Sequence, residues 1–313
     1  MKVFIHIDSK STYIGNGGFL VLTNLANELG KLGYETYLFD PKDKITHKKL
    51  EWLSLPEKHF RITKSKKILQ NRPKDYRLIT AWLRTLPEKY RNESLRYLES
   101  SELLREGHEP ERNFLLKNNI KIANLHKNLT HIYNSLGIRN MINIEVWIRN
   151  DVKYYGQEKI KNSVGIQLEK QRFLKIFTRY DWSRYSLFKN KNIIICNGTY
   201  QEVIYKMNKA DLFIHNPKPS PHIGIFKGET FGLPLFEAMA CGCVCIARKH
   251  EGIKFLNGII PLVESMQEAK EILTQLTNNK EEKEEIRNKS LTFIEKNYRF
   301  DEERKNAILR WLE

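Results

Sequence analysis

The stretch GETFGLPLFEAMACGCVCIA, residues 228–247, predicts a turn, a short helix and a buried strand in immediate succession. The Phe-Gly pair forms the turn, and Pro234 suits the first helical turn, where a backbone N–H is not needed. The helix runs from Pro234 to about Ala240 and leads into an apolar strand at residues 244–247. A helix followed closely by an apolar strand is the repeating unit of parallel α/β folds.

The same alternation runs along the chain in two halves. The first forty residues predict a strand (3–7), a glycine-rich turn (11–18), a helix (19–32) that ends at Gly33, and a second strand (34–39). Further expected elements are strands at 77–82, 121–125, 142–147, 192–198, 211–215 and 258–263, and helices at 96–107, 130–136, 170–179, 200–207 and 266–297. We therefore expect an α/β fold of two doubly wound, Rossmann-like domains, residues 1–151 and 152–297, with a C-terminal helix (298–313) that packs back on the first.

Two glutamates, Glu229 and Glu237, flank the predicted helix start at a spacing of eight. The free N–H groups and positive dipole end of a helix N-terminus bind phosphate. Glu237, one turn into the helix, is placed to accept hydrogen bonds from ribose hydroxyls, as acidic residues do in dinucleotide-binding folds. Glu229, just outside the helix, would reach what lies beyond the phosphates. The spacing suggests a nucleotide sugar as ligand.

The residues E-T-F-G-L-P-L-F-E-A-M-A-C-G resemble the E-x7-E signature of the retaining glycosyltransferases of family four. KADLFIHNPKPS (209–220) resembles the segment that precedes this signature, and LANELGKLGYETYLF (25–39) resembles the family's first βα unit. RLITAWL (77–83) and YLESSELL (97–104) are similar to the middle of the first domain in the rhamnosyltransferase-like branch. The resemblance implies the GT-B fold, two Rossmann-like domains facing a cleft. It also implies transfer of a sugar, with retained configuration, from a nucleoside diphosphate sugar, for which a UDP type is favoured.

Site residues are carried over position by position from this resemblance. It implies that Glu229, the expected catalytic residue, contacts hydroxyls of the donor sugar, while positive groups and helix dipoles stabilise the leaving group. The implied donor-binding residues are Thr230, Phe231 and Gly232 through backbone groups, Glu237 at the ribose, and Gly17 and Gly18 near the phosphates. The Arg and Lys that usually clamp the diphosphate are missing from VGIQLEKQRF (164–173), where Lys170 and Arg172 are the available substitutes. No cofactor or metal is expected, because GT-B enzymes need no D-x-D site and the sequence contains none.

Three further residues are candidates for the acceptor side. Glu99 and Glu102 fall where the related branch has acidic residues near the acceptor cleft, although either suits an exposed helix face. Trp82 ends a predicted parallel strand and lines the acceptor side or packs in the core. The cysteines at positions 241, 243 and 245 lack the C-x2-C spacing of zinc sites, so we expect them on one face of a strand as small buried residues.

Charge and composition restrict the partners and the compartment. The chain carries a formal charge of +16, and residues 41–92 hold fifteen Lys or Arg against five Asp or Glu. This basic segment is either a solvated surface or a site for an anionic acceptor, a membrane surface or a nucleic acid. The clustered cysteines make no spaced disulfide framework, and no apolar run approaches a membrane span. We expect a cytoplasmic protein, with a peripheral position at the inner membrane face as an extension of that expectation.

Three functions fit these observations. The leading one is a metal-independent hexosyltransferase that acts on a surface glycan or a lipid-linked precursor. The second is a GT-B glycosyltransferase that acts on modified DNA bases, for which the basic segment would supply the affinity. The third, suggested by the missing clamp, is a non-catalytic nucleotide-sugar-binding partner subunit. The sequence names neither the base, the sugar nor the acceptor.

Overall fold

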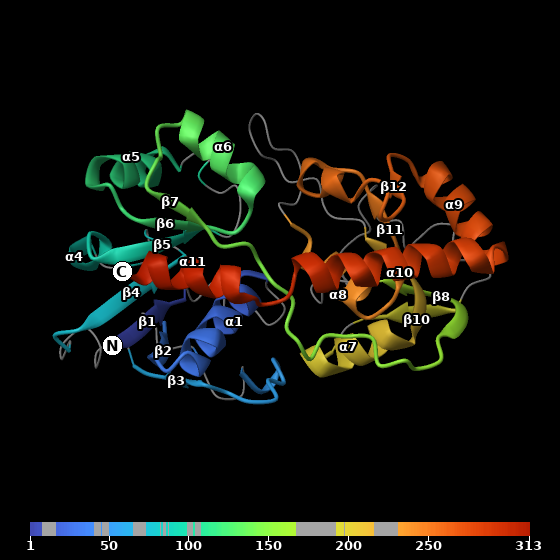
Figure 1. The fold of residues 1–313 in the computed structure, drawn as a ribbon, viewed down its shortest axis with the longest axis horizontal. Coiled ribbons are helices and arrows are strands. Elements are labelled where there is room, and N and C mark those ends of the chain that lie inside the picture. The colour runs from blue at the N-terminus through green and yellow to red at the C-terminus, as the bar shows by residue number, and fades with distance from the viewer. Residues whose placement is uncertain are drawn as a thin grey trace, which may run out of the picture. The chain divides into compact units, whose positions relative to one another are not determined.

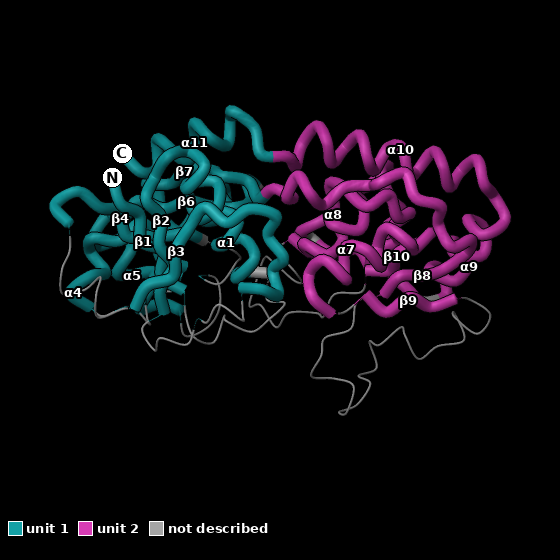
Figure 2. Tube along the Cα trace, turned by 90° about the horizontal axis from the view of Figure 1, so that it is seen from below, with its two compact units in different colours: residues 1–146, 300–313 teal, residues 147–299 magenta. Residues whose placement is uncertain are grey.

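The computed structural model describes residues 1–7, 17–40, 45, 50–64, 73–81, 83, 86, 88–98, 103, 108–166, 192–196, 198–215 and 231–313. These form two compact units, residues 1–146 with 300–313 and residues 147–299 (Figure 2). The chain thus passes between the units after Val146 and again after Arg299, close to the boundaries at 151 and 297 expected from the sequence.

The described part of the first unit is built on a seven-stranded, parallel sheet of order β3-β2-β1-β4-β5-β6-β7 (Figure 1). Its strands are β1 (Lys2–His6), β2 (Glu35–Phe39), β3 (Phe60–Ile62), β4 (Tyr76–Thr80), β5 (Ser94–Leu98), β6 (Ile122–Asn124) and β7 (Met141–Asn143). Its helices are α1 (Gly17–Lys31), α4 (Glu88–Arg91), α5 (Glu109–Asn118), α6 (Lys127–Ser135) and α11 (Glu302–Leu312). Because all strands are parallel, their carboxyl ends share one edge of the sheet.

Helix α1 follows from its apolar spacing. Leu22, Leu25 and Leu29 are fully buried, and Gly33 ends the helix with φ of +90°, a conformation that a side chain disfavours. The prediction of a helix here is confirmed. It begins at Gly17, however, so the two glycines that we assigned to the preceding turn are the first residues of the helix.

The last helix, α11, belongs to the first unit. Trp311 is fully buried, with its ring centroid 5.5 Å from that of Tyr97 in β5. The Arg77 guanidinium donates to the carbonyl of Leu312 at the helix end, where free carbonyl groups need donors. Residues distant in sequence therefore fix the C-terminal helix to this unit.

In the described part of the second unit, a five-stranded parallel sheet has the order β12-β11-β10-β8-β9. Figure 1 labels β8, β10, β11 and β12 of this sheet. Its strands are β8 (Ile160–Ile166), β9 (Ile193–Ile195), β10 (Ala210–His215), β11 (Val244–Arg248) and β12 (Leu262–Val263). Its helical elements are α7 (Tyr200–Lys209), α8 (Leu233–Ala240), a short 3-10 helix (Glu251–Leu256), α9 (Met266–Asn278) and α10 (Lys280–Asn297).

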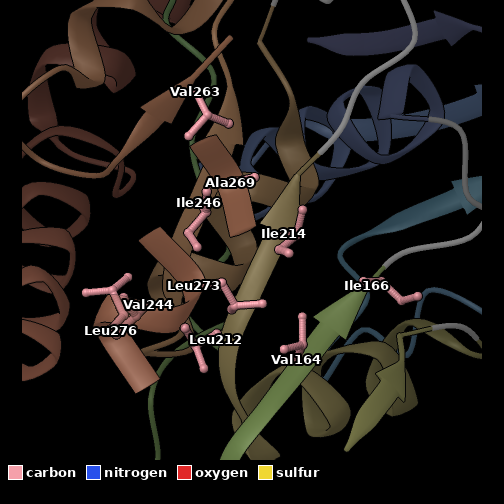
Figure 3. Close-up of a cluster of buried hydrophobic side chains, with 10 residues drawn as sticks. All are labelled: Val164, Ile166, Leu212, Ile214, Val244, Ile246, Val263, Ala269, Leu273 and Leu276. Atoms are coloured by element: carbon pink, nitrogen blue, oxygen red, sulfur yellow. The ribbon is translucent and has the colours of Figure 1, made fainter. Parts of the chain in front are cut away.

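Alternating residues of the three central strands form the core of this unit. Val164, Leu212 and Val244 are fully buried and meet Leu273 and other side chains of α9 on one face (Figure 3). On the opposite face, strand residues pack toward α8, and the thiol of Cys245 lies 3.9 Å from a backbone oxygen of that helix. The sheet therefore lies between helices on both faces, as in other doubly wound folds.

Several expected elements differ in kind or extent, and the strand expected at 142–147 is limited to Met141–Asn143. Residues 96–98 of the helix expected at 96–107 belong instead to strand β5, and residues 99–102 and 104–107 lie outside the described residues. Arg96 is buried in an ion pair with Glu111, so a charged residue stands where the sequence pattern of a core strand would have an apolar one. The expected helix 266–297 is two helices that meet at Asn279, whose side chain accepts from the N–H of Glu282 at 3.1 Å and caps α10. The strand expected at 258–263 is limited to Leu262–Val263.

A buried ion-pair cluster joins α10 to the amino end of β10. The carboxylate of Asp211 lies 2.6 Å from Lys283 Nζ and 2.9 Å from Arg287 Nη2, and all three side chains are at least nine-tenths buried. The backbone N–H of Asn162 also donates to Asp211, at 3.0 Å. Each buried charge in this cluster has an opposite partner.

The substitution Asp211→Asn tests this cluster. It leaves two cations buried without their counter-charge, which costs about 3–5 kcal/mol when a buried pair is broken. We expect the free energy of unfolding, measured by urea denaturation, to fall by a large part of that amount. The control is Glu285→Gln, because Glu285 pairs with Lys289 at 2.6 Å with both side chains more than half exposed, a geometry worth less than about 1 kcal/mol. Equal effects of the two substitutions would contradict the prediction.

Candidate functional site

The candidate site lies at the carboxyl edge of the second unit's sheet. Strand β11 begins at the amino edge of the sheet, and helix α8 ends shortly before it. The amino end of α8 therefore lies at the carboxyl edge, where β10 ends. Gly232 caps α8 with φ of 72° and ψ of 53°, a left-handed conformation that favours glycine. Its carbonyl accepts from the N–H of Leu235 at 2.8 Å, and Pro234 occupies the first turn. The sequence-predicted turn and helix start are confirmed.

An aromatic cluster holds the residue before this cap. The ring of Phe231 stacks on that of Phe236 with centroids 4.1 Å apart and an interplanar angle of 13°. Tyr298 packs against both rings, at 5.5 Å from Phe231 and 4.8 Å from Phe236. Because Phe236 lies within α8 and Tyr298 ends α10, the chain approaching Gly232 is fixed by two helices.

Glu237 points into the protein from the second turn of α8. It is 3% exposed, and its Oε1 accepts a hydrogen bond of 2.5 Å from the hydroxyl of Tyr200. Tyr200 begins α7, which follows β9 and therefore starts at the same edge of the sheet. A capping box between Thr199 and Glu202 fixes the start of α7. The acid Glu237 and its hydrogen-bond donor Tyr200 thus lie near the amino ends of two different helices, α8 and α7.

The guanidinium of Arg149 lies over the ring of Tyr200. Its carbon atom lies 4.7 Å from the ring centroid, a cation–π contact. The same guanidinium pairs with both carboxylate oxygens of Asp151, at 2.8 and 2.5 Å. The main chain of Arg149 is held in turn by Arg299, which donates to the carbonyls of Arg149 and Val152 at 2.9 and 3.0 Å.

The electrostatics of this group follow from burial. Desolvation raises the pKa of Glu237 to about 7, although the Tyr200 hydrogen bond and the Arg149 charge favour the ionised form. Burial, and next the charge of Glu237, raises the pKa of the Tyr200 hydroxyl well above its usual value. Tyr200 therefore remains a hydrogen-bond donor at neutral pH, beside a carboxyl group that titrates near neutrality.

A second group of polar residues lies at the carboxyl edge of the first unit's sheet. His6 ends β1, is fully buried, and its Nδ1 lies 2.7 Å from the hydroxyl of Thr80 at the end of β4. Burial, with the charge of Arg96, lowers the pKa of His6 to about 3, so the imidazole is neutral. The sequence alone assigns no histidine of the first domain to the site. The only sequence signal for His6 is its place at the end of a strand.

The predicted site residues are only partly described. Phe231, Gly232 and Glu237 lie together at the start of α8, whereas Gly17 and Gly18 begin α1 in the first unit. The remaining predicted site residues lie outside the described residues: Glu229, Thr230, Lys170, Arg172, Trp82, Glu99 and Glu102. Tyr200 and Arg149 are not indicated by the sequence, because neither belongs to the motif and only the fold brings them to Glu237.

The cysteines serve packing. Cys241, Cys243 and Cys245 are fully buried and free, and burial raises the pKa of each thiol. They do not share one strand face as expected, because Cys241 ends α8, Cys243 precedes the strand, and only Cys245 lies in β11. Among the described residues, no group of three or more His, Cys, Asp or Glu side chains is placed to hold a metal ion.

Comparisons with known proteins agree with this architecture. Residues 181–292 match the family model of the glycosyl transferases group 1. A search of curated proteins gave no match. Anabaena HepE, solved in complex with UDP and glucose, aligns with a TM-score of 0.67 and 12% identity over 99% of this chain and 98% of its own. The chain has the GT-B fold.

Two further solved structures extend this fold comparison. WaaG, a glycosyltransferase involved in lipopolysaccharide biosynthesis, aligns with a TM-score of 0.64 and 12% identity over 98% of this chain and 99% of its own. A T4 phage BGT mutant in complex with UDP-glucose aligns with a TM-score of 0.53 and 13% identity over 100% and 97%. In the part of the chain that the structure describes, no helix is long and apolar enough to cross a membrane.

The substitution Glu237→Gln tests the buried carboxyl group. An acid with a pKa of about 7 in the native state and near 4.5 in the unfolded state keeps its proton to a higher pH in the native state. The free energy of unfolding therefore falls as pH rises between these values. Gln cannot ionise, so we expect the unfolding free energy of the variant, relative to wild type, to rise by a few kcal/mol from about pH 5 to about pH 8. Glu285→Gln, at an exposed site, should show no such trend. A pH-independent difference for Glu237→Gln would contradict burial of an ionisable group there.

Proposed function

We propose that this protein is a retaining, metal-independent GT-B glycosyltransferase that uses a nucleoside diphosphate sugar, of UDP type, as donor. The observation that carries the proposal is Glu237, a nearly buried acid one turn into α8, behind a left-handed Gly232 cap in the matched region. In this assignment Glu237 binds the ribose, the backbone from Thr230 to Gly232 meets the diphosphate, and Glu229 contacts the sugar. Lys170 and Arg172 supply positive charge to the leaving diphosphate.

We infer the class of acceptor from the positive charge of the first unit. The basic segment 41–92 of the first unit fits an anionic acceptor or an anionic lipid surface, so we propose a surface glycan or its lipid-linked precursor. The protein would then act at the cytoplasmic side of a membrane without spanning it. The similarity in fold to WaaG, which is involved in lipopolysaccharide biosynthesis, is consistent with this acceptor class.

Donor binding is tested by a thermal-shift panel of UDP, GDP, ADP and their sugar conjugates. A ligand that binds only the native state at one hundred times its Kd stabilises that state by about 2.7 kcal/mol. We expect UDP and a UDP-sugar to raise the melting temperature and the other nucleotides to have smaller effects. A panel without any stabilising nucleotide would contradict a donor site.

The substitution Glu229→Gln tests catalysis. We expect transfer or donor hydrolysis to fall by roughly 10²–10³, the range for loss of one transition-state contact, with UDP affinity little changed. Activity is measured by UDP release from the donor that binds best. Full activity of the variant would refute the assignment of Glu229, and wild-type binding without turnover on any acceptor would favour the non-catalytic partner subunit.

The second candidate function is glycosylation of modified DNA bases. The basic segment and the similarity in fold to a T4 phage protein that binds UDP-glucose favour it. Retention on duplex DNA would fall steeply with salt and would not need lipid. We expect instead stronger retention on vesicles that contain anionic lipid than on DNA at physiological salt. Tighter binding to DNA would favour the second candidate.

A further inference from the structure

Among the described residues, one oxygen of the Glu237 carboxylate has a hydrogen-bond donor and the other has none. Oε1 accepts from Tyr200, and among the described residues no hydrogen bond reaches Oε2. The residue is 3% exposed, so the group has little freedom and almost no water around it. A buried carboxylate is stable only with donors, and each of its oxygens has room for more than one. Oε2 is therefore the atom that a ligand hydroxyl can reach.

Tyr200 is itself held from two sides. The capping box of α7 fixes its backbone, through the Thr199 hydroxyl that accepts from the N–H of Glu202 and the Glu202 carboxylate that accepts from the N–H of Thr199. The Arg149 guanidinium lies 4.7 Å from the centre of its ring, and the bidentate pair with Asp151 fixes that guanidinium in turn. The direction of the hydroxyl is therefore set before any ligand binds.

We propose that Tyr200 is a positioning residue that fixes Glu237 through Oε1 and so presents Oε2 to the ribose hydroxyls of the donor. This inference rests on the proposed function, in which Glu237 binds the ribose, and adds the residues that make that contact selective. A carboxylate with one oxygen fixed has a defined direction for the second, and a vicinal diol has to match it. Arg149 acts one step further away, by holding the ring of Tyr200 in place.

The substitution Tyr200→Phe removes the hydroxyl and keeps the ring beneath Arg149. The probes are UDP and its 2′-deoxy form, dUDP, with both Kd values measured by calorimetry. Without the Tyr200 donor the Glu237 carboxylate is no longer held in one direction, so we expect UDP to bind about tenfold more weakly. We also expect the ratio of the dUDP Kd to the UDP Kd to fall at least about threefold, because a misdirected Glu237 no longer favours the diol. A purely structural role of Tyr200 would weaken both nucleotides equally.

Two controls separate the proposal from its alternatives. Tyr205→Phe makes the same chemical change on the same helix at a side chain that is 57% exposed, and should leave both Kd values unchanged. In a Glu237→Gln background, Tyr200→Phe should change the Kd ratio by less than about twofold, because the residue it positions is already altered. A similar fall of the ratio in both backgrounds, or no fall in either, would overturn the role of Tyr200.

The substitution Arg149→Lys tests the same step without deleting the hydroxyl, and serves if Tyr200→Phe does not fold. Lys keeps the charge but loses the planar stack and the bidentate pair, so the Kd ratio should again fall. If Tyr200→Phe folds, an unchanged Kd ratio in Arg149→Lys would refute only the part assigned to Arg149. If Tyr200→Phe does not fold, an unchanged Kd ratio in Arg149→Lys would refute the whole proposal. A wild-type protein that binds no UDP would overturn the proposed function and this inference with it. UDP binding that prefers ribose and loses that preference in Glu237→Gln, but not in Tyr200→Phe, would leave the proposed function intact and reject this inference alone.

Discussion

Burial of the Glu237 carboxyl group is the constraint on which the candidate site in the second unit depends. An acid that is 3% exposed needs a donor, and the donor comes from a different helix, α7, through Tyr200. That contact forms only if α7 and α8 both begin at the carboxyl edge of the sheet, which the parallel strand order ensures. It also needs Gly232 in a left-handed conformation to turn the chain into α8. The glutamate, the cap and the strand order are therefore parts of one arrangement.

The two edges of this sheet treat buried acids differently. At the amino edge Asp211 meets two buried cations and a backbone N–H, so although burial would raise its pKa, these partners hold the pKa below its usual value. At the carboxyl edge Glu237 meets a neutral hydroxyl, and the nearby cation Arg149 is already paired with Asp151. The first acid is satisfied by the protein alone, which is typical of a structural role. The burial cost of the Glu237 carboxylate is only partly offset by its partners, and ionisable groups with such shifted pKa values are concentrated at binding and catalytic sites.

The sequence predicted the alternation of strands and helices and the start of α8, because apolar spacing and Gly and Pro signals are local. It failed where burial of a charge hides a strand, as at Arg96, whose partner Glu111 lies fifteen positions away. It also failed at Asn279, where one residue ends a helix and caps the next. The hydrogen-bond partner of Glu237 could not be predicted from the sequence, because Tyr200 lies 37 positions from it and only the crossover through β10 brings the two together. The motif pointed to Glu237 but not to Tyr200, which donates a hydrogen bond to it.

A raised pKa in the free protein has a consequence for ligand binding. Ionised Glu237 is penalised by burial, and a ligand hydroxyl that donates to Oε2 stabilises that ionised form, so bound ligand lowers the pKa again. If Glu237 binds ribose as proposed, part of the binding free energy at neutral pH compensates a penalty already present in the free protein. A fully satisfied glutamate would make the free protein more stable and leave less to gain from the ribose. In the proposed arrangement the ligand gains from this only while Tyr200 holds Oε1 and keeps Oε2 directed at the ribose, because a misdirected carboxylate would lack donors without favouring a diol.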